Sequence, residues 1–416
     1  MFTARHFWLI ILAVAAVLLG LAAWCYSLGA PRQVVAPRGA EPDDYVGDQR
    51  CAACHQDIHA MQSHSRMARA LATAGDGRLT PGEVIDPVNQ LRYEVREDGG
   101  TWRLQVSRCS DDLSEAERAE AAVAQIAYLL GSGDRGITPV SDLNANEYRE
   151  LRISFYGDTG SWDFTPGQEV ANLSNLSNAL GRRIEKKGRL GCLSCHSTLL
   201  VQSGEAIDTA ASRFGVHCER CHGPGRQHSE AAGKGEFLPT SNPAVAQATA
   251  LAHRLLEGET RKSPQDRFLL SVARAGDDRL IRDLYMCGEC HGRNAIHEHL
   301  EGDELAMFQV AALAASRCFQ ESRGKLRCTD CHNPHRDVEN ADRSGYVDVC
   351  RKCHVGDRAD RTLTDRRDEE EVAARVCPID AEGRCVDCHM PKKTPMYRSR
   401  FTHHRIGLYD SGADEK

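Results

Sequence analysis

The sequence predicts a mainly α, loop-rich fold in which a small α/β insert separates two unequal parts. Three observations predict it. Aromatic residues make up only 6% of the 416 residues and the mean hydropathy is −0.46, which is lean for a conventional apolar core. Six of the seven Cys-x-x-Cys-His motifs crowd into residues 191–404, where strand patterns are scarce. Alternating strand patterns occur mainly between the first motif and the second.

The cysteine motifs are the most specific feature of the chain. Fourteen of its 18 cysteines form seven pairs, and a His directly follows every pair. The motifs are Cys51-Cys54-His55, Cys192-Cys195-His196, Cys218-Cys221-His222, Cys287-Cys290-His291, Cys328-Cys331-His332, Cys350-Cys353-His354 and Cys385-Cys388-His389. A zinc site does not need a His at this position, and a thioredoxin-like motif would occur once in a βαβ unit. Seven adjacent His by chance have a probability on the order of 10⁻¹⁰.

Covalent haem attachment explains this pattern. Two cysteine thioethers hold the edge of the porphyrin, and the adjacent imidazole reaches the iron as its proximal ligand. The sequence therefore predicts seven covalently attached c-type haems. With so little polypeptide per haem, porphyrins must fill much of the interior, so the expected fold is haem-templated. The net charge of −7 and the lack of a long basic block argue against a nucleic-acid partner.

The N-terminus carries an apolar segment. Phe7 to Trp24 is an 18-residue run without a charge, which just reaches the length of a membrane-spanning helix. A cleaved signal peptide is the alternative. Because c-type haem is attached after export, we expect residues 1–30 to anchor the body on the periplasmic, extracytoplasmic side of the cytoplasmic membrane. Residues 31–45 are rich in Pro and are expected to form a flexible linker.

We expect two modules after the linker, a first haem module at 46–190 and a six-haem module at 191–416. In the first, Leu91–Val95 and Thr101–Val106 flank the sequence EDGG and predict a hairpin. A further strand is predicted at 150–157. A helix is predicted over 113–130 because Ser114 and Glu117 form a capping-box pattern. Short helices of the second module are predicted at 263–275, 303–318 and 365–376.

Ten His outside the motifs and beyond the N-terminal run are candidate distal ligands. His335 follows His332 by three residues, so in a helical turn both side chains point the same way and cannot easily flank one iron. His335 should therefore ligate a neighbouring haem. His228 lies six residues after His222, across Gly-Pro-Gly, which also favours projection towards another haem.

Beyond the bare motifs, the chain resembles the multihaem cytochromes related to the nitrifiers' tetrahaem cytochrome and to hydroxylamine oxidoreductase. The resemblance runs from Tyr45 to about Ile406. It rests on the segments YVGDQRCAACHQDI, GSWDFTPGQE, HCERCHGPGRQH, SRCFQESRGKLRCTDCHNPH, CVDCHMPKK and FTHHRI. In such proteins the His after CHGPG, the second His of CHNPH and a His near the end serve as distal ligands. The resemblance thus implicates His228, His335 and His404.

The chain departs from that family after the first motif. The family usually has a Trp followed by Ser-x-His, whereas an ungapped alignment places Gln62, Ser65 and Met67 at those positions. Either Met67 or the nearby His64 could be the ligand, and a Met ligand would raise the potential of its haem. Packing of Met67 against a porphyrin is the alternative.

Two functions remain open at this point. One is respiratory electron transfer, with redox proteins as partners and a quinol-oxidising membrane protein as the donor. The other is an oxidoreductase in which one open iron acts on a small nitrogen or sulfur compound. No Cys-x-x-Cys-Lys motif occurs, whereas the related nitrite reductases use Lys at their active haem, so the sequence favours electron transfer. It does not determine the oligomeric state.

Overall fold

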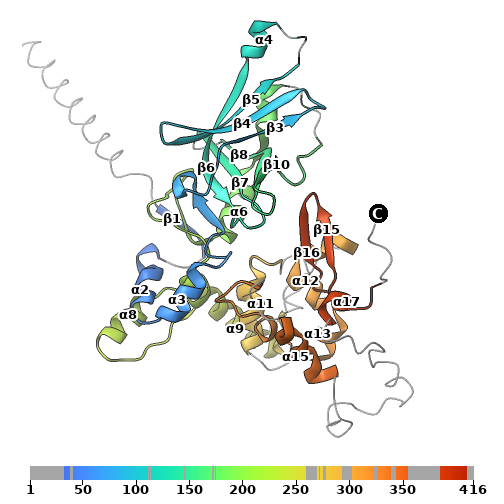
Figure 1. Ribbon diagram of the computed structural model, residues 1–416. Coiled ribbons are helices and arrows are strands. Elements are labelled where there is room, and N and C mark those ends of the chain that lie inside the picture. The colour runs from blue at the N-terminus through green and yellow to red at the C-terminus, as the bar shows by residue number, and fades with distance from the viewer. Residues whose placement is uncertain are drawn as a thin grey trace, which may run out of the picture.

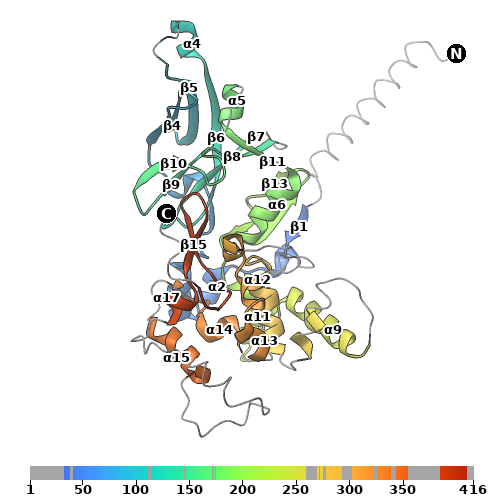
Figure 2. The ribbon, with the colours of Figure 1, turned by 90° about the vertical axis from the view of Figure 1, so that its right-hand side faces the viewer.

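The computed structural model describes residues 32–37, 41–110, 112, 114–144, 147–170, 173, 175–258, 269–270, 272–274, 278–292, 302–322, 326–338, 343–354 and 385–409. A strand-rich part lies above a part built from short helices (Figure 1). The same two parts are distinct after a quarter turn (Figure 2). The helices at the first motif lie in the lower, helical part, although they precede all strands but the first in the sequence (Figure 1).

The strand-rich part is centred on an eight-stranded antiparallel sheet in the order β11-β8-β7-β6-β5-β4-β3, with β2 paired to β6. Its strands are β2 (Leu71–Thr73), β3 (Gly82–Asp86), β4 (Leu91–Asp98), β5 (Thr101–Arg108), β6 (Ala121–Leu130), β7 (Thr138–Asn144), β8 (Glu147–Leu151) and β11 (Gly181–Ile184). Alternate residues of β4 and β5, among them Tyr93 and Leu104, are fully buried. This period of two places one face of the sheet on the apolar core.

Three smaller sheets surround it. The strands β9 (Ile153–Tyr156) and β10 (Ser161–Phe164) form one hairpin, and β15 (Lys392–Met396) and β16 (Ser399–Thr402) form another. The last sheet joins β1 (Arg32–Ala36), β12 (Ser197–Ser203), β13 (Ala206–Ile207) and β14 (Arg213–Phe214). Residues 32–36, which we expected to be a flexible linker, are thus the strand that pairs with buried β12.

The helical part is made of short helices. The helices described for the whole chain are α2 (Asp48–Ala52), α3 (Gln56–Ser63), α4 (Glu115–Ala119), α5 (Leu176–Ala179), α6 (Lys186–Cys195), α7 (Cys218–His222), α8 (Arg226–Gly233), α9 (Pro243–Leu256), α11 (Asp278–Gly288), α12 (Gln309–Ala314), α13 (Arg317–Ser322), α14 (Cys328–Cys331), α15 (Arg343–His354) and α17 (Cys385–His389), with 3-10 turns η1 (Pro42–Asp44), η2 (Ala74–Asp76) and η4 (Gly302–Met307). Of these, α4 and α5 lie beside strands of the strand-rich part (Figure 2). A buried apolar cluster joins α9 to α11 through Ala252, Leu280 and Ile281.

The prediction of a mainly α fold is wrong, because the described residues form a mixed α/β fold with several antiparallel sheets. The largest error is the helix predicted over 113–130. The capping box of Ser114 and Glu117 is present, but α4 ends at Ala119 and strand β6 follows. Strand β6 pairs with β5 and β7 on its two sides and buries Ala124 and Ile126 in the core. Tertiary pairing therefore overrides the local helical preference.

Of the other predicted elements, one is confirmed, two are divided, and two lie wholly or mostly outside the described residues. The hairpin at 91–106 is confirmed as β4 and β5. The single strand predicted at 150–157 is divided between β8 and β9, which belong to different sheets and meet at the buried Arg152. The helix predicted at 303–318 is broken into η4, α12 and the start of α13. The helix predicted at 365–376 lies outside the described residues, as does most of the one at 263–275.

The predicted membrane location also needs correction. Within the described ranges, no helix is long and apolar enough to cross a membrane, contrary to the N-terminal helical anchor that we expected. The run from Phe7 to Trp24, on which that prediction depended, lies outside the described residues.

Candidate haem-attachment sites

All seven motifs lie on or at the end of a short helix. They are found on α2, α6, α7, α11, α14, α15 and α17 or in the turn that follows. In a helical turn, residues three apart lie on the same side, so the two cysteines of a motif can face one porphyrin edge. The turn also brings the His back towards the first cysteine, since the N–H of His55 donates to Cys51 O (2.9 Å) and that of His332 to Cys328 O (2.9 Å).

Cysteines of different motifs lie side by side. The thiols of Cys51 and Cys218 lie close enough that the pKa of Cys51 is raised and that of Cys218 lowered by their interaction, and Cys287 and Cys328 form a second pair of this kind. The Cys290 thiol of the fourth motif also donates to the backbone oxygen of Cys195 in the second (3.4 Å). Since each cysteine marks the edge of its cofactor, these contacts bring the first motif next to the third and the fourth next to both the second and the fifth.

The remaining motifs continue this series. The Cys331 thiol of the fifth motif is close enough to Cys350 of the sixth to raise its own pKa, after the larger effect of burial. Cys350 in turn interacts with Cys385 of the seventh motif. The supporting helices α14, α15 and α17 pack in the same order. Cys221 of the third motif lies close enough to Cys287 of the fourth to help raise the pKa of that thiol, after the larger effects of the Cys328 contact and burial. The contacts therefore connect the motifs in the order one, three, four, five, six, seven, with motif two beside motif four.

Three pairs of imidazoles face each other across the helical part. The ring centroids of His55 and His228 are 6.3 Å apart with an interplanar angle of 20°. The rings of His222 and His335 are 6.0 Å apart and nearly parallel at 8°. The rings of His332 and His404 are 6.1 Å apart and inclined at 39°. Each pair joins a proximal His to one of the three His that the resemblance implicated.

These separations fit an iron between the two rings. Metal–imidazole bonds are about 2 Å long, so one metal held by two imidazole nitrogens separates the ring centres by about 6 Å once the ring radii are added. A direct stack of two neutral rings would be closer, at roughly 4.5–5 Å, towards the lower end of the range for stacked rings. The three facing His pairs are therefore spaced as the two imidazole ligands of one haem iron would be.

Hydrogen bonds hold three of the candidate ligand rings by their Nδ1 atoms. The Nδ1 atom of His228 contacts Leu238 O (2.6 Å), that of His404 contacts Thr402 O (2.9 Å), and that of His389 contacts Gly407 O (2.8 Å). Since a carbonyl oxygen only accepts, Nδ1 carries the proton in each case. The Nε2 atom is then the one free to bind a metal.

Burial keeps several candidate ligands uncharged. It lowers the pKa of His291 and of His332, and it lowers the pKa of His404 to about 4. At neutral pH these rings are therefore neutral, which is the form that binds a metal.

The other two candidate ligands lie elsewhere. His64 is exposed, and Met67 lies in the turn after α3. The Met67 oxygen accepts from Val216 N (2.8 Å), and Ala70 O of the same turn contacts His196 Nδ1 (2.9 Å). This turn thus lies against the second motif, whereas the proximal His of the first motif faces His228.

A glycine makes the turn between the third motif and His228 possible. Gly223, at the end of α7, has a backbone φ of +85°, a value that residues other than glycine rarely adopt. A Cβ atom there would lie 2.1 Å from Ser241 O. The segment CHGPG therefore needs glycine at this position to bring α8 and its His228 back towards the first motif.

Sequence reasoning missed a group of charged residues inside and beside the motifs. The third motif contributes buried Glu219 and Arg220, and Arg220 Nη2 contacts Glu289 Oε2 of the fourth motif (3.1 Å). On α11 the fully buried Asp283 accepts from Thr329 Oγ1 of the fifth motif (2.6 Å). The only sequence signal was charge in the spacer between two cysteines, which is equally typical of a solvated helix face.

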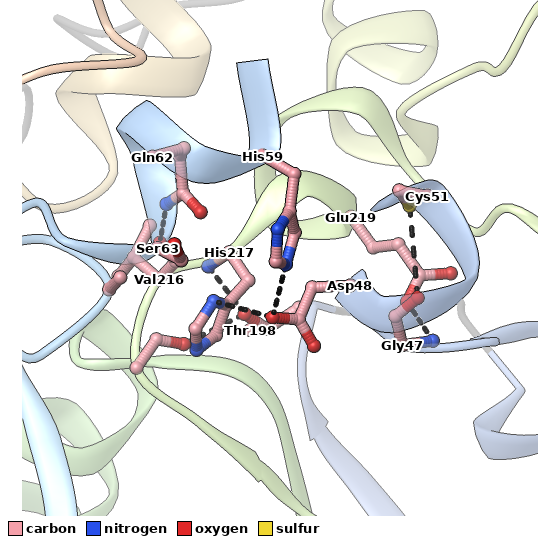
Figure 3. A network of polar contacts seen from close by, with 12 residues as sticks. Gly47, Asp48, Cys51, His59, Gln62, Ser63, Thr198, Val216, His217 and Glu219 are labelled. Carbon is pink, nitrogen blue, oxygen red and sulfur yellow. Dashed lines mark hydrogen bonds and ion pairs between the residues drawn. The ribbon is translucent and has the colours of Figure 1, made fainter. Parts of the chain in front are cut away.

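A second group, also missed as a unit, lies between the first and third motifs. His59 Nε2 is 3.3 Å and His217 Nδ1 is 3.6 Å from Asp48 Oδ2 (Figure 3). Burial lowers the pKa of His217, more than the Asp48 carboxylate raises it. The cluster joins α2, α3 and the start of α7, and so connects the attachment helices of the first and third motifs.

Comparison with known proteins finds similarity to cytochromes. Residues 160–223 match the family described as cytochrome c554 and c-prime. The multiheme cytochrome MtrA of Shewanella baltica (strain OS185) is 25% identical over 221 residues, which are 47% of this chain and 62% of that protein. The crystal structure of the outer cell wall cytochrome OcwA has a TM-score of 0.38 at 17% identity, over 87% of this chain and 80% of that chain.

The chain thus spans less than two thirds of the length of the curated relative that it matches. The family match covers only residues 160–223, which include the second motif and the third. Together, the matches support assigning the chain to the multihaem c-type cytochromes, which hold haem covalently.

Proposed function

We propose that this chain is a heptahaem c-type cytochrome that relays electrons outside the cytoplasm between redox partner proteins. The observation that carries the proposal is the continuous series of neighbouring motifs, in which three proximal His already face a second imidazole. Bound haem supplies a one-electron carrier at each motif. As part of this proposal, the chain is related to the nitrifiers' tetrahaem cytochrome and to hydroxylamine oxidoreductase.

The geometry supports a role for each of these residues in the proposal. The fourteen motif cysteines hold the porphyrins and the seven motif His are the proximal ligands. His228, His335 and His404 are the distal ligands opposite His55, His222 and His332, respectively. A His on each side of an iron leaves its coordination unchanged on reduction, which favours transfer and excludes substrate. Each distal His comes from a different part of the chain and so also joins two segments of the fold.

Two measurements on the purified holoprotein test this proposal. The intact mass of the denatured protein should show seven haem additions, and electron paramagnetic resonance of the oxidised protein should show low-spin signals. Replacing His335 by Ala should convert one haem to a high-spin form without changing the mass increment. The matched control is His253→Ala, because His253 is an exposed His of α9 that contacts Asp278 (3.2 Å).

Two results would contradict the proposal. A resolved count of six haems or fewer would remove the heptahaem assignment. A stoichiometric high-spin haem in the wild type that turns over nitrite, hydroxylamine or sulfite would make the protein an oxidoreductase instead.

A further inference from the structure

We propose that Glu219, inside the third motif, is the positioning residue that sets the axial ligand pair of the haem on the first motif and lowers its reduction potential. Glu219 lies between Cys218 and Cys221 and is only 4% exposed. The haem on which it would act is thus not the one attached to its own motif. The proposal rests on haem binding at Cys51 and Cys54.

The Glu219 carboxylate accepts three backbone N–H groups. Oε1 accepts from Val46 (2.9 Å) and Gly225 (2.8 Å), and Oε2 accepts from Gly47 (2.8 Å). Figure 3 shows the side chain reaching the backbone at Gly47 beside Cys51. Hydrogen bonds to a carboxylate are roughly twice as strong as those between neutral groups. Three of them on one buried side chain are therefore a strong constraint on its surroundings.

The donors come from the two segments that carry the ligand pair. Gly47 is the N-cap of α2, which leads to His55, and Gly225 is the N-cap of α8, which carries His228. Neither N-cap is satisfied by a side chain of its own. Glu219 therefore supplies, from α7, the acceptor that both helix starts lack. One side chain thus sets the separation of the two rings that face each other at 6.3 Å.

The space around the carboxylate is tightly filled. A Cβ atom at Gly225 would lie 3.2 Å from Glu219 Oε1 and 3.1 Å from Val46 Cγ2. Because the backbone at Gly225 has a negative φ of −96°, Ala is conformationally allowed there. Gly225→Ala is therefore a way to displace the carboxylate without removing its charge.

The charge itself acts on the first motif. Glu219 Oε2 accepts from Gly47 N, and Gly47 O in turn contacts Cys51 Sγ (3.7 Å), so the carboxylate lies beside the residue that contacts the first attachment cysteine. A buried negative charge stabilises the oxidised iron, which carries one more positive charge than the reduced iron. The potential of the haem on the first motif should therefore be lower with Glu219 than without it.

The test uses the full holoprotein and first identifies the relevant signal. The low-spin resonance that disappears in His228→Ala belongs to the haem on the first motif. Glu219→Gln keeps the shape of the side chain but removes the charge and at least one acceptor. In this variant we expect the same resonance to shift its g values and the corresponding step of the redox titration to move to a higher potential. In Glu219→Ala we expect part of that haem to become high-spin.

Two further variants make the outcome specific. Glu236→Gln removes an equal charge from an exposed position after α8 and should leave both readouts unchanged. Gly225→Ala should shift the g values with a smaller change in potential. Unaltered g values and potential in folded Glu219→Gln with full haem content would refute the positioning role. If Glu219→Ala does not fold, the Gln variant and Gly225→Ala decide the question. If no low-spin resonance of the wild type disappears in His228→Ala, ligation of one haem by His55 and His228 is refuted instead.

Discussion

Removal of the Arg152 guanidinium should destabilise the strand-rich part strongly. Arg152 lies where β8 passes into β9 and is only 1% exposed. Its Nη1 donates to Asp86 Oδ2 (2.7 Å), its Nε donates to Gln168 O (3.0 Å), and its guanidinium lies 4.8 Å from the centre of the Phe164 ring. One side chain thus joins the main sheet to the β9–β10 hairpin.

The magnitude follows from what Arg152→Ala would leave behind. Removing one partner of a buried ion pair costs about 3–5 kcal/mol, because the other charge stays buried. Asp86 would keep hydrogen bonds from Asn89 Nδ2 (2.8 Å) and Val88 N (3.0 Å). These bonds place the expected loss of unfolding free energy near the lower end of the range, at about 3 kcal/mol.

Urea unfolding followed by far-ultraviolet circular dichroism measures this loss, and the haem absorbance reports the helical part separately. Arg103→Ala is the matched control, because Arg103 and Asp98 form an ion pair whose side chains are 40% and 63% exposed. An exposed pair of this kind contributes at most about 1 kcal/mol. If Arg152→Ala costs no more than Arg103→Ala, the reasoning about buried charge in this sheet is wrong.

Three further predictions concern Asp86, Gly223 and Asp163. Burial alone would raise the pKa of Asp86, but the hydrogen bonds from Asn89 and the pairing with Arg152 lower it overall. The ionised Asp86 carboxylate should therefore contribute fully to the unfolding free energy above about pH 4, and this contribution should fall as the pH drops below that value. Urea titrations at several pH values measure the change. Gly223→Ala should lower the midpoint of urea unfolding monitored by haem absorbance and perturb the low-spin signal assigned to the first motif, because its Cβ meets Ser241 O; an unchanged midpoint would contradict this. Asp163 accepts from Arg398 Nη1 (2.6 Å) at the tip of the β15–β16 hairpin, which extends towards β9 and β10 (Figure 2). Asp163→Ala should therefore speed hydrogen exchange at the β15–β16 turn and leave the haem content unchanged.

The sequence alone determined the features that depend on neighbours along the chain. A haem-attachment motif is complete within five residues, so all seven were evident, together with the cofactor they imply. The hairpin of β4 and β5 and the capping box at Ser114 were predicted for the same reason, because their hydrogen bonds join residues close in sequence.

Tertiary structure decided what depends on residues far apart. The segment 121–130 became β6 because strands on both sides could pair with it, which no local pattern revealed. The sequence suggested that His228 and His335 turn towards neighbouring haems, but only the fold shows them facing His55 and His222. The role inferred for Glu219 also depends on chain segments that meet only in the folded protein. Burial and ring separation arise from packing between distant segments, so the sequence near each residue does not contain them.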